Sequence, residues 1–185
     1  MKVSRMLFLA ALLAAGPGPT ATEAAPQFVN SPRPMAAPTA GDRVFLTDTV
    51  LDELLGEALG EQARERPGTD RFVGHAAQMA AVHTLRLGAA RGLAVIHGVR
   101  PPGALDADRL VILTRLSSRD GPSYERAYAR VALELHQRIL ERLEAQARGG
   151  DDPDLRREAS LGVAPAMSLV RLSDTLWNAL TPAGL

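Results

Sequence analysis

The stretch SYERAYARVALELHQRILERLEAQAR, residues 123–148, decides the fold class of this 185-residue chain. Its apolar residues recur at three- and four-residue steps, which is the spacing of an α-helix that buries one face. The apolar stripe consists of Tyr124, Tyr128, Val131, Leu135 and Ile139. Gly149 and Gly150 follow and end the pattern. The stretch therefore predicts a long amphipathic helix that packs against other helices.

The remaining segments carry the same period between clear boundary signals. Thr47, Asp48 and Thr49 offer N-cap side chains for a first helix that ends at Pro67-Gly68. Further helices are predicted over Asp70–His97, Asp106–Leu116 and Pro153–Ala179. No segment shows sustained period-two alternation. We therefore predict an all-α fold, an antiparallel four-helix bundle with an extra short helix between the second and third long helices, and a kink at Pro165.

The first residues have the three-part layout of a secretory signal peptide. Lys2 and Arg5 precede the apolar run Met6–Ala15, and small residues around Ala24 offer a cleavage site. The run is too short to span a bilayer, which needs about 20 residues. An uncleaved membrane anchor is the alternative interpretation. We predict that residues 1–24 are removed and that the protein is exported and periplasmic, with association with the envelope left open.

The mature chain then divides into a linker and a folded domain. Residues 25–44 are rich in proline and alanine and predict a flexible linker, and residues 45–180 predict the helical bundle. Once the leader is removed, no stretch is long and apolar enough to be a transmembrane helix.

Composition excludes several kinds of chemistry. The chain has no cysteine, which excludes thiol nucleophiles, disulfides and thiolate-bound metals. Its only lysine is Lys2, in the leader, which excludes Schiff-base chemistry and a P-loop lysine in the folded domain. The formal net charge is zero, with 21 basic and 21 acidic residues, which argues against a nucleic-acid binder. Site chemistry is left to histidine, methionine, tyrosine and carboxylates.

Three of the four histidines are predicted to lie near the core. His83 sits in the middle of the apolar stripe of the second helix, and His75 lies two turns earlier at the edge of that stripe. His136 lies on the shoulder of the 123–148 stripe and is partly core-facing. His97 falls at a helix C-terminus, where a cation complements the helix dipole.

Several short motifs follow one another along the chain. They are Gly60-x-x-Ala63, MAAVHT at residues 79–84, Gly98-Val99 before Pro102, YERAY at residues 124–128 with His136 eight residues later, the acidic run Asp151–Asp154, and Ala164-Pro165. In this order and spacing the chain resembles domain-of-unknown-function family 4142 from about Phe45 to Leu176. The resemblance implies an exported bacterial helical bundle of ferritin-like type.

The chain departs from the family at polar positions. The family commonly has an acidic residue where this chain has Val82, Leu135 and Gly56. It commonly has a histidine where this chain has Val170. Asp52 and Glu53 lie close to Gly56 in the sequence. If those positions form a site in relatives, His83 and His136 are what this chain retains of it.

The histidines also allow a test for metal chemistry. A ferritin-like di-iron centre needs a Glu-x-x-His motif on two helices. The residues three before the four histidines are Phe72, Ala80, Ala94 and Leu133, so a di-iron oxidase is not expected. His83 and His136 are the candidate ligands for copper or iron, with His75 and Met79 as weaker candidates.

A single ion cannot take every candidate on the second helix, because His75 and His83 are about 12 Å apart along it. A further ligand such as His136 or Met167 would then be required. The alternative, which we favour, is that Met79 fills core space and His83 is a buried, hydrogen-bonded histidine.

Two functional hypotheses follow. The favoured one is a non-catalytic exported bundle, without a cofactor, that binds an unknown protein or small-molecule partner in the envelope or serves in a stress response. The alternative is a periplasmic metal-binding or redox protein that uses copper or iron on the inward-facing histidines. The sequence names neither the partner nor the oligomeric state.

Overall fold

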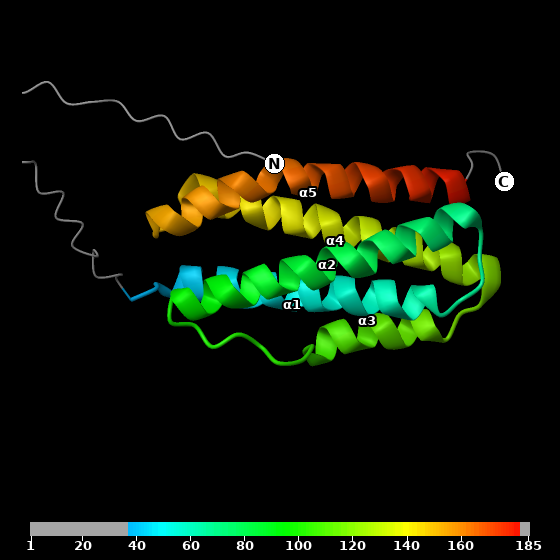
Figure 1. The fold of residues 1–185 in the computed structure, drawn as a ribbon, viewed down its shortest axis with the longest axis horizontal. Helices are drawn as coiled ribbons and strands as arrows, with labels where there is room; N and C mark the ends of the chain where they lie inside the picture. The colour runs from blue at the N-terminus through cyan, green and yellow to red at the C-terminus, as the bar shows by residue number, and fades with distance from the viewer. Residues whose placement is uncertain (1–36, 182–185) are drawn as a thin grey trace, which may run out of the picture. The chain divides into compact units, whose positions relative to one another are not determined.

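The computed structural model describes residues 37–181 and is entirely helical there (Figure 1). The predicted all-α fold is confirmed, with no strand in the described range. The helices are α1 (Ala40–Arg64), α2 (Asp70–Ile96), α3 (Ala107–Ser117), α4 (Gly121–Gly149) and α5 (Pro153–Leu180). The predicted signal peptide and most of the predicted linker lie outside the described residues.

The first helix begins earlier than the sequence pattern predicted. The Thr39 hydroxyl accepts the backbone N–H of Asp42, and the Asp42 carboxylate accepts the backbone N–H of Thr39, which makes a capping box. Residues 40–44 are therefore helical instead of being part of a linker, and Thr47 and Thr49 lie inside the helix. The neighbouring Pro38 and Gly41 favoured a linker, and the capping signal at Thr39 was overlooked.

The other boundaries follow the predicted signals closely. The Thr69 hydroxyl accepts the backbone N–H of Phe72 and so caps α2. Gly98 ends α2 with a φ of 69°, a left-handed conformation that glycine adopts without steric cost. Pro165 lies within α5, which continues to Leu180.

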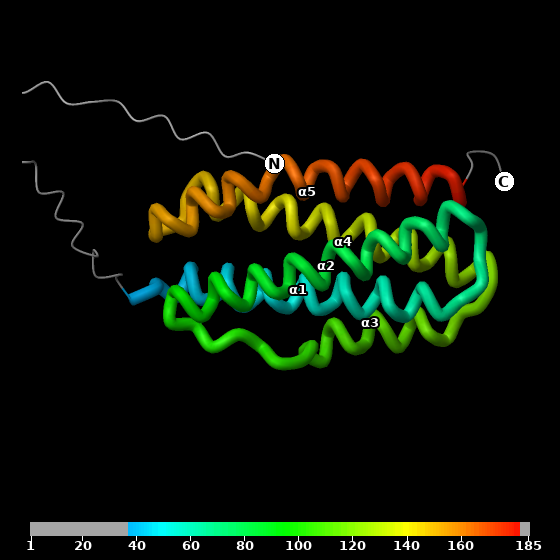
Figure 2. The backbone as a smooth tube through the Cα atoms, in the orientation of Figure 1, coloured from blue at the N-terminus to red at the C-terminus, as the bar shows by residue number. Residues whose placement is uncertain are grey.

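The helices pack most closely in sequential pairs, α1 with α2 and α4 with α5, as the backbone trace shows (Figure 2). Contacts of α1 with α4, and of α2 with α5, are fewer. The close approach of α1 to α2 depends on Gly60, where an added Cβ would lie 2.4 Å from the backbone nitrogen of Ala80.

The short helix α3 is fixed to α1 and α4 by charge. Asp52 of α1 is fully buried and accepts hydrogen bonds from Arg109 of α3, at 2.8 Å, and from Arg142 of α4. Arg109 also donates to Asp106 at the start of its own helix. Because a buried carboxylate needs such partners, this cluster specifies where α3 lies.

Within residues 37–181, none of the helices combines the length and the hydropathy needed to cross a bilayer.

Candidate functional site

The interior contains one continuous line of polar side chains, which we call the histidine chain. Each of the four long helices contributes to it, and none of its members is more than 4% exposed. The members are Glu53 from α1, His75 and His83 from α2, Tyr128 and His136 from α4, and Ser173 from α5. Because buried polar groups are costly unless they are hydrogen-bonded, their arrangement is the main chemical feature of the core.

His83 and His136 meet at the centre of the chain. Their Nε2 atoms are 3.1 Å apart, their ring planes are within 7° of parallel, and their ring centroids are 5.4 Å apart. The rings therefore meet edge to edge, with the two Nε2 atoms facing each other. One of these nitrogens carries a proton and the other accepts it, which is the geometry of an N–H···N hydrogen bond.

An ion pair completes one end of the chain. The Nδ1 atom of His83 lies 2.7 Å from one Glu53 oxygen, and the Arg86 Nε donates to the other at 2.8 Å. The His83 ring fits against α1 only because residue 56 is glycine, since a Cβ there would lie 2.4 Å from the ring. A glycine thus makes room for the imidazole, and the carboxylate that binds it comes from one turn earlier.

The other end of the chain runs through a serine to a phenol. Ser173 lies between two histidines, with its Oγ 2.8 Å from Nδ1 of His136 and 3.1 Å from Nε2 of His75. The Nδ1 atom of His75 is 2.9 Å from the hydroxyl of Tyr128. Residues that are far apart in sequence are thereby joined across α2, α4 and α5.

These distances allow one consistent direction of proton donation when the histidines are neutral. A neutral imidazole has one donor and one acceptor nitrogen. Ionised Glu53 accepts from Nδ1 of His83, so Nε2 of His83 accepts from His136. His136 in turn accepts from the hydroxyl of Ser173, and Ser173 accepts from His75. His75 accepts from the hydroxyl of Tyr128, which supplies the last proton. Within residues 37–181, no buried side-chain nitrogen or oxygen lacks a partner.

A further proton would reverse this order. If His83 carried protons on both nitrogens, its Nε2 would become a donor, and His136 would have to accept there. Each later hydrogen bond would then change direction, and the hydroxyl proton of Tyr128 would have no acceptor among the described residues. The neutral form of the chain is thus the one in which all of its members are satisfied.

The pKa values agree with a neutral chain. Burial, with a smaller contribution from the neighbouring His83, lowers the pKa of His75 to about 4 and that of His136 to about 2. Burial also raises the pKa of Tyr128 well above its usual range. These groups are therefore uncharged near pH 7.

The structure brings together some of the predicted metal ligands. His83 and His136 face each other, and His75 joins them through Ser173. Met79 is buried in the hydrophobic core, whereas Met167 is 43% exposed. Within residues 37–181, no three histidine or acidic side chains are placed to hold one ion.

In the observed orientation, the facing nitrogens of the central pair leave no room for an ion between them. An ion on the line between two imidazole nitrogens, at about 2.0–2.1 Å from each, would separate them by about 4 Å. The observed separation is 3.1 Å. The proton between His83 and His136 would have to leave and the rings would have to move apart, and the metal hypothesis stays a prediction.

Sequence reasoning missed part of the chain. Glu53 was noted only as a neighbour of an unusual glycine, and Tyr128 only as part of an apolar stripe. Ser173 was not identified, although it is a polar residue between Leu169 and Leu176 on the buried face of α5. His97 is buried, and its Nδ1 lies 3.4 Å from an oxygen of Asp152, a partner that the dipole argument did not include.

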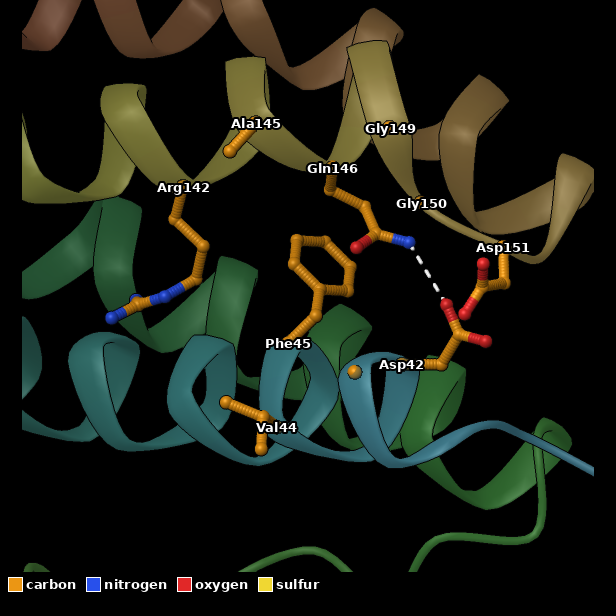
Figure 3. Close-up of a pocket in the computed structure, with 10 residues that line it drawn as sticks. Asp42, Val44, Phe45, Arg142, Ala145, Gln146, Gly149, Gly150 and Asp151 are labelled. Carbon is orange, nitrogen blue, oxygen red and sulfur yellow. Dashed lines mark hydrogen bonds between the residues drawn. The ribbon is translucent and has the colours of Figure 1, made fainter.

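Among the hollows within residues 37–181 are two that border α1. One, of about 290 Å³, lies between the start of α1 and the end of α4, where the Gln146 amide donates to Asp42 (Figure 3). The other, of about 490 Å³, lies between α2 and α5 and is lined in part by Glu53 and Arg86. The second hollow therefore reaches the charged end of the histidine chain.

Comparison with known proteins gives one match. The model of the family described as Domain of unknown function (DUF4142) matches residues 28–165. Neither the curated proteins nor the solved structures contain a match to the chain. The matched range includes α1 to α4, the first half of α5, and every member of the histidine chain except Ser173.

Proposed function

The chain belongs to the family Domain of unknown function (DUF4142), and from that premise we propose that it is a non-catalytic binding protein of the bacterial cell envelope. One observation carries the proposal. The histidine chain contains three of the four histidines, and each of their ring nitrogens is hydrogen-bonded to another member of it.

Catalysis would need a different arrangement. A general base or a nucleophile must reach the reacting group of a substrate and have a pKa near the working pH. His83 and His136 are no more than 1% exposed, and each of their ring nitrogens already has a partner. The low pKa values of His75 and His136 also make them weak bases. The interior is better suited to holding four helices together than to chemistry.

The proposal includes the architecture and the location. We propose that the helices form an antiparallel four-helix bundle of ferritin-like type and that residues 1–24 direct export and are removed. The protein then acts in the periplasm or attached to the envelope, in a binding or stress-related role. The layout of residues 1–24 and the lack of a membrane-spanning helix within residues 37–181 support this location.

Two measurements test this function. Purified, untagged protein should neither consume peroxide nor oxidise ferrous or cuprous ions above the rate without protein. Turnover that disappears in His83→Ala or His136→Ala would refute the non-catalytic assignment. Mass spectrometry of the protein from its native host should give an N-terminus at Ala25, and an intact Met1 would instead support a membrane anchor.

A metal-binding role is the second candidate, because two imidazole nitrogens face each other at the centre of the core. Metal analysis of untagged protein after incubation with copper, iron or zinc tests it. Stoichiometric binding that His83→Ala and His136→Ala abolish would support a metal site. His97→Gln is the matched control, because His97 is a buried histidine outside the chain. Binding that all three variants retain would exclude this site.

A further inference from the structure

We propose that the hollow between α2 and α5 binds a fatty acid, with its alkyl chain along the apolar wall and its carboxylate on Arg86. The inference deepens the proposed function, on which it rests, because it gives the binding protein a class of ligand. It is carried by the size, the lining and the hydrogen-bonding groups of this hollow.

The hollow has the dimensions and the walls of a ligand site. Its volume is about 490 Å³, and small-molecule pockets typically measure about 300–1,000 Å³. Its apolar lining comes from all four long helices and includes Phe45, Ala90, Leu93, Ile96, Leu143 and Ala159. Such a lining favours an apolar ligand, because covering it removes hydrocarbon surface from water.

Small residues keep the hollow open. A Cβ added at Gly92 of α2 would meet no atom within 4 Å. At Gly162, on the facing side of α5, an added Cβ would lie 3.1 Å from the side chain of Leu143. Ile96, which lines the hollow, is 63% exposed, so a bound alkyl chain would cover apolar surface there.

The polar end of the ligand is specified by Arg86. Its Nε is occupied by Glu53, and its side chain is 24% exposed. Neither of its terminal nitrogens has a hydrogen-bond partner among residues 37–181. Guanidinium groups bind carboxylates through pairs of N–H donors, so this free edge of Arg86 matches a carboxylate.

Charge favours a singly charged headgroup. Glu53 is only 1% exposed and is already bound by Arg86 and His83, so it offsets part of the arginine charge. Glu158 lines the same hollow and repels negative charge. A carboxylate adds one negative charge beside Arg86, whereas an alkyl phosphate monoester would add up to two. The site therefore fits a fatty acid better than an alkyl phosphate monoester.

Calorimetric titration of the untagged protein at pH 7.5 tests the proposal with three probes, with decanoate kept below its micellar concentration and decanol below its solubility limit. We expect decanoate to bind with one-to-one saturation and decanol to bind about tenfold more weakly, because it lacks the charge-assisted hydrogen bonds. Acetate, which lacks the alkyl chain, should produce no saturable heat. Decanol that binds as tightly as decanoate would overturn the assignment of a carboxylate.

A matched pair of variants locates the site. Gly92→Leu should fill the hollow and weaken decanoate binding at least about tenfold. Gly88→Leu should leave it within about twofold of the original protein, because Gly88 lies one turn away on the same helix, also faces open space and does not line the hollow. Thermal unfolding of both variants shows that they are folded. Equal binding by both variants would overturn the location.

A third variant tests the headgroup. Arg86→Gln should reduce decanoate binding to the level of decanol and leave decanol binding unchanged. Equal decanoate binding by this variant and the original protein would remove Arg86 from the site. If decanoate gives no saturable heat with folded protein, the fatty-acid proposal fails, while the peroxide and metal-oxidation assays still decide whether the protein is non-catalytic.

Discussion

Mild acid should unfold this protein, because the histidine chain must stay neutral in the folded state. Burial lowers the folded-state pKa of His75 to about 4 and of His136 to about 2, whereas an exposed histidine titrates near about 6.5. The folded-state pKa values lie below the unfolded ones, so the unfolded chain binds more protons as the pH falls. The free energy of unfolding must therefore decrease below about pH 6.5.

The size of the effect follows from these values. Each histidine that stays neutral in the folded state lowers the free energy of unfolding by about 1.4 kcal/mol per pH unit below about pH 6.5. For His75 the decrease levels off near pH 4, after a loss of about 3 kcal/mol. For His136 it continues toward pH 2. By pH 4.5 the two together remove about 5 kcal/mol, which is comparable with the whole stability of many domains.

Urea unfolding followed by circular dichroism, at steps between pH 7.5 and pH 4.5, measures this loss. Carboxylates also begin to titrate near the lower end of this window, so a variant that removes one histidine is needed to isolate the histidine contribution. His75→Gln is the informative variant, because a glutamine can donate to Ser173 and accept from Tyr128 but does not titrate. It should lose about half as much stability as the original protein across the window. A loss below about 2 kcal/mol in the original protein, or an unchanged slope in His75→Gln, would refute the reasoning.

Two further predictions concern residues that position the interior. Gly56→Ala should lower the free energy of unfolding by about 1–3 kcal/mol in urea titrations, because its Cβ would collide with the His83 ring. Gly74→Ala, where an added Cβ meets nothing, should instead gain about 0.5–1 kcal/mol, and equal effects of the two would contradict a steric role for Gly56. Asp52→Asn should cost about 3 kcal/mol, because Arg109 and Arg142 lose the charge of a fully buried partner. Hydrogen exchange should then speed up in α3, which Arg109 ties to Asp52, and unchanged protection of α3 would show that other contacts hold it.

The fold class could be predicted because helix-forming signals are local. The stripe through Tyr128 and Leu135, and the glycines and prolines between stripes, depend only on nearby residues. The start of α1 was wrong because the capping residue, Thr39, stands among residues typical of a linker. Local patterns thus predicted the helices better than their ends.

The candidate site was harder to predict because its contacts are long-range. The inward direction of His83 and His136 follows from helical spacing, but their partners do not. His83 binds Glu53 thirty residues earlier in the sequence, and His136 binds Ser173 thirty-seven residues later. No periodicity within one helix specifies which residue of another helix lies opposite. The sequence shows that Gly56 replaces an acid that is common in the family. Only the packing shows that this glycine makes room for the imidazole of His83.

The histidine chain also selects among alternative packings of the same helices. A core built mainly of leucine and alanine would bury similar areas if α4 and α5 slid by one turn against α1 and α2. Such a slip would separate His136 from His83, and Ser173 and Tyr128 from His75, at a cost of several unmade buried hydrogen bonds. Only one register satisfies all the hydrogen bonds of the histidine chain. The chain therefore specifies how the helices pack, which a purely apolar interior does not do.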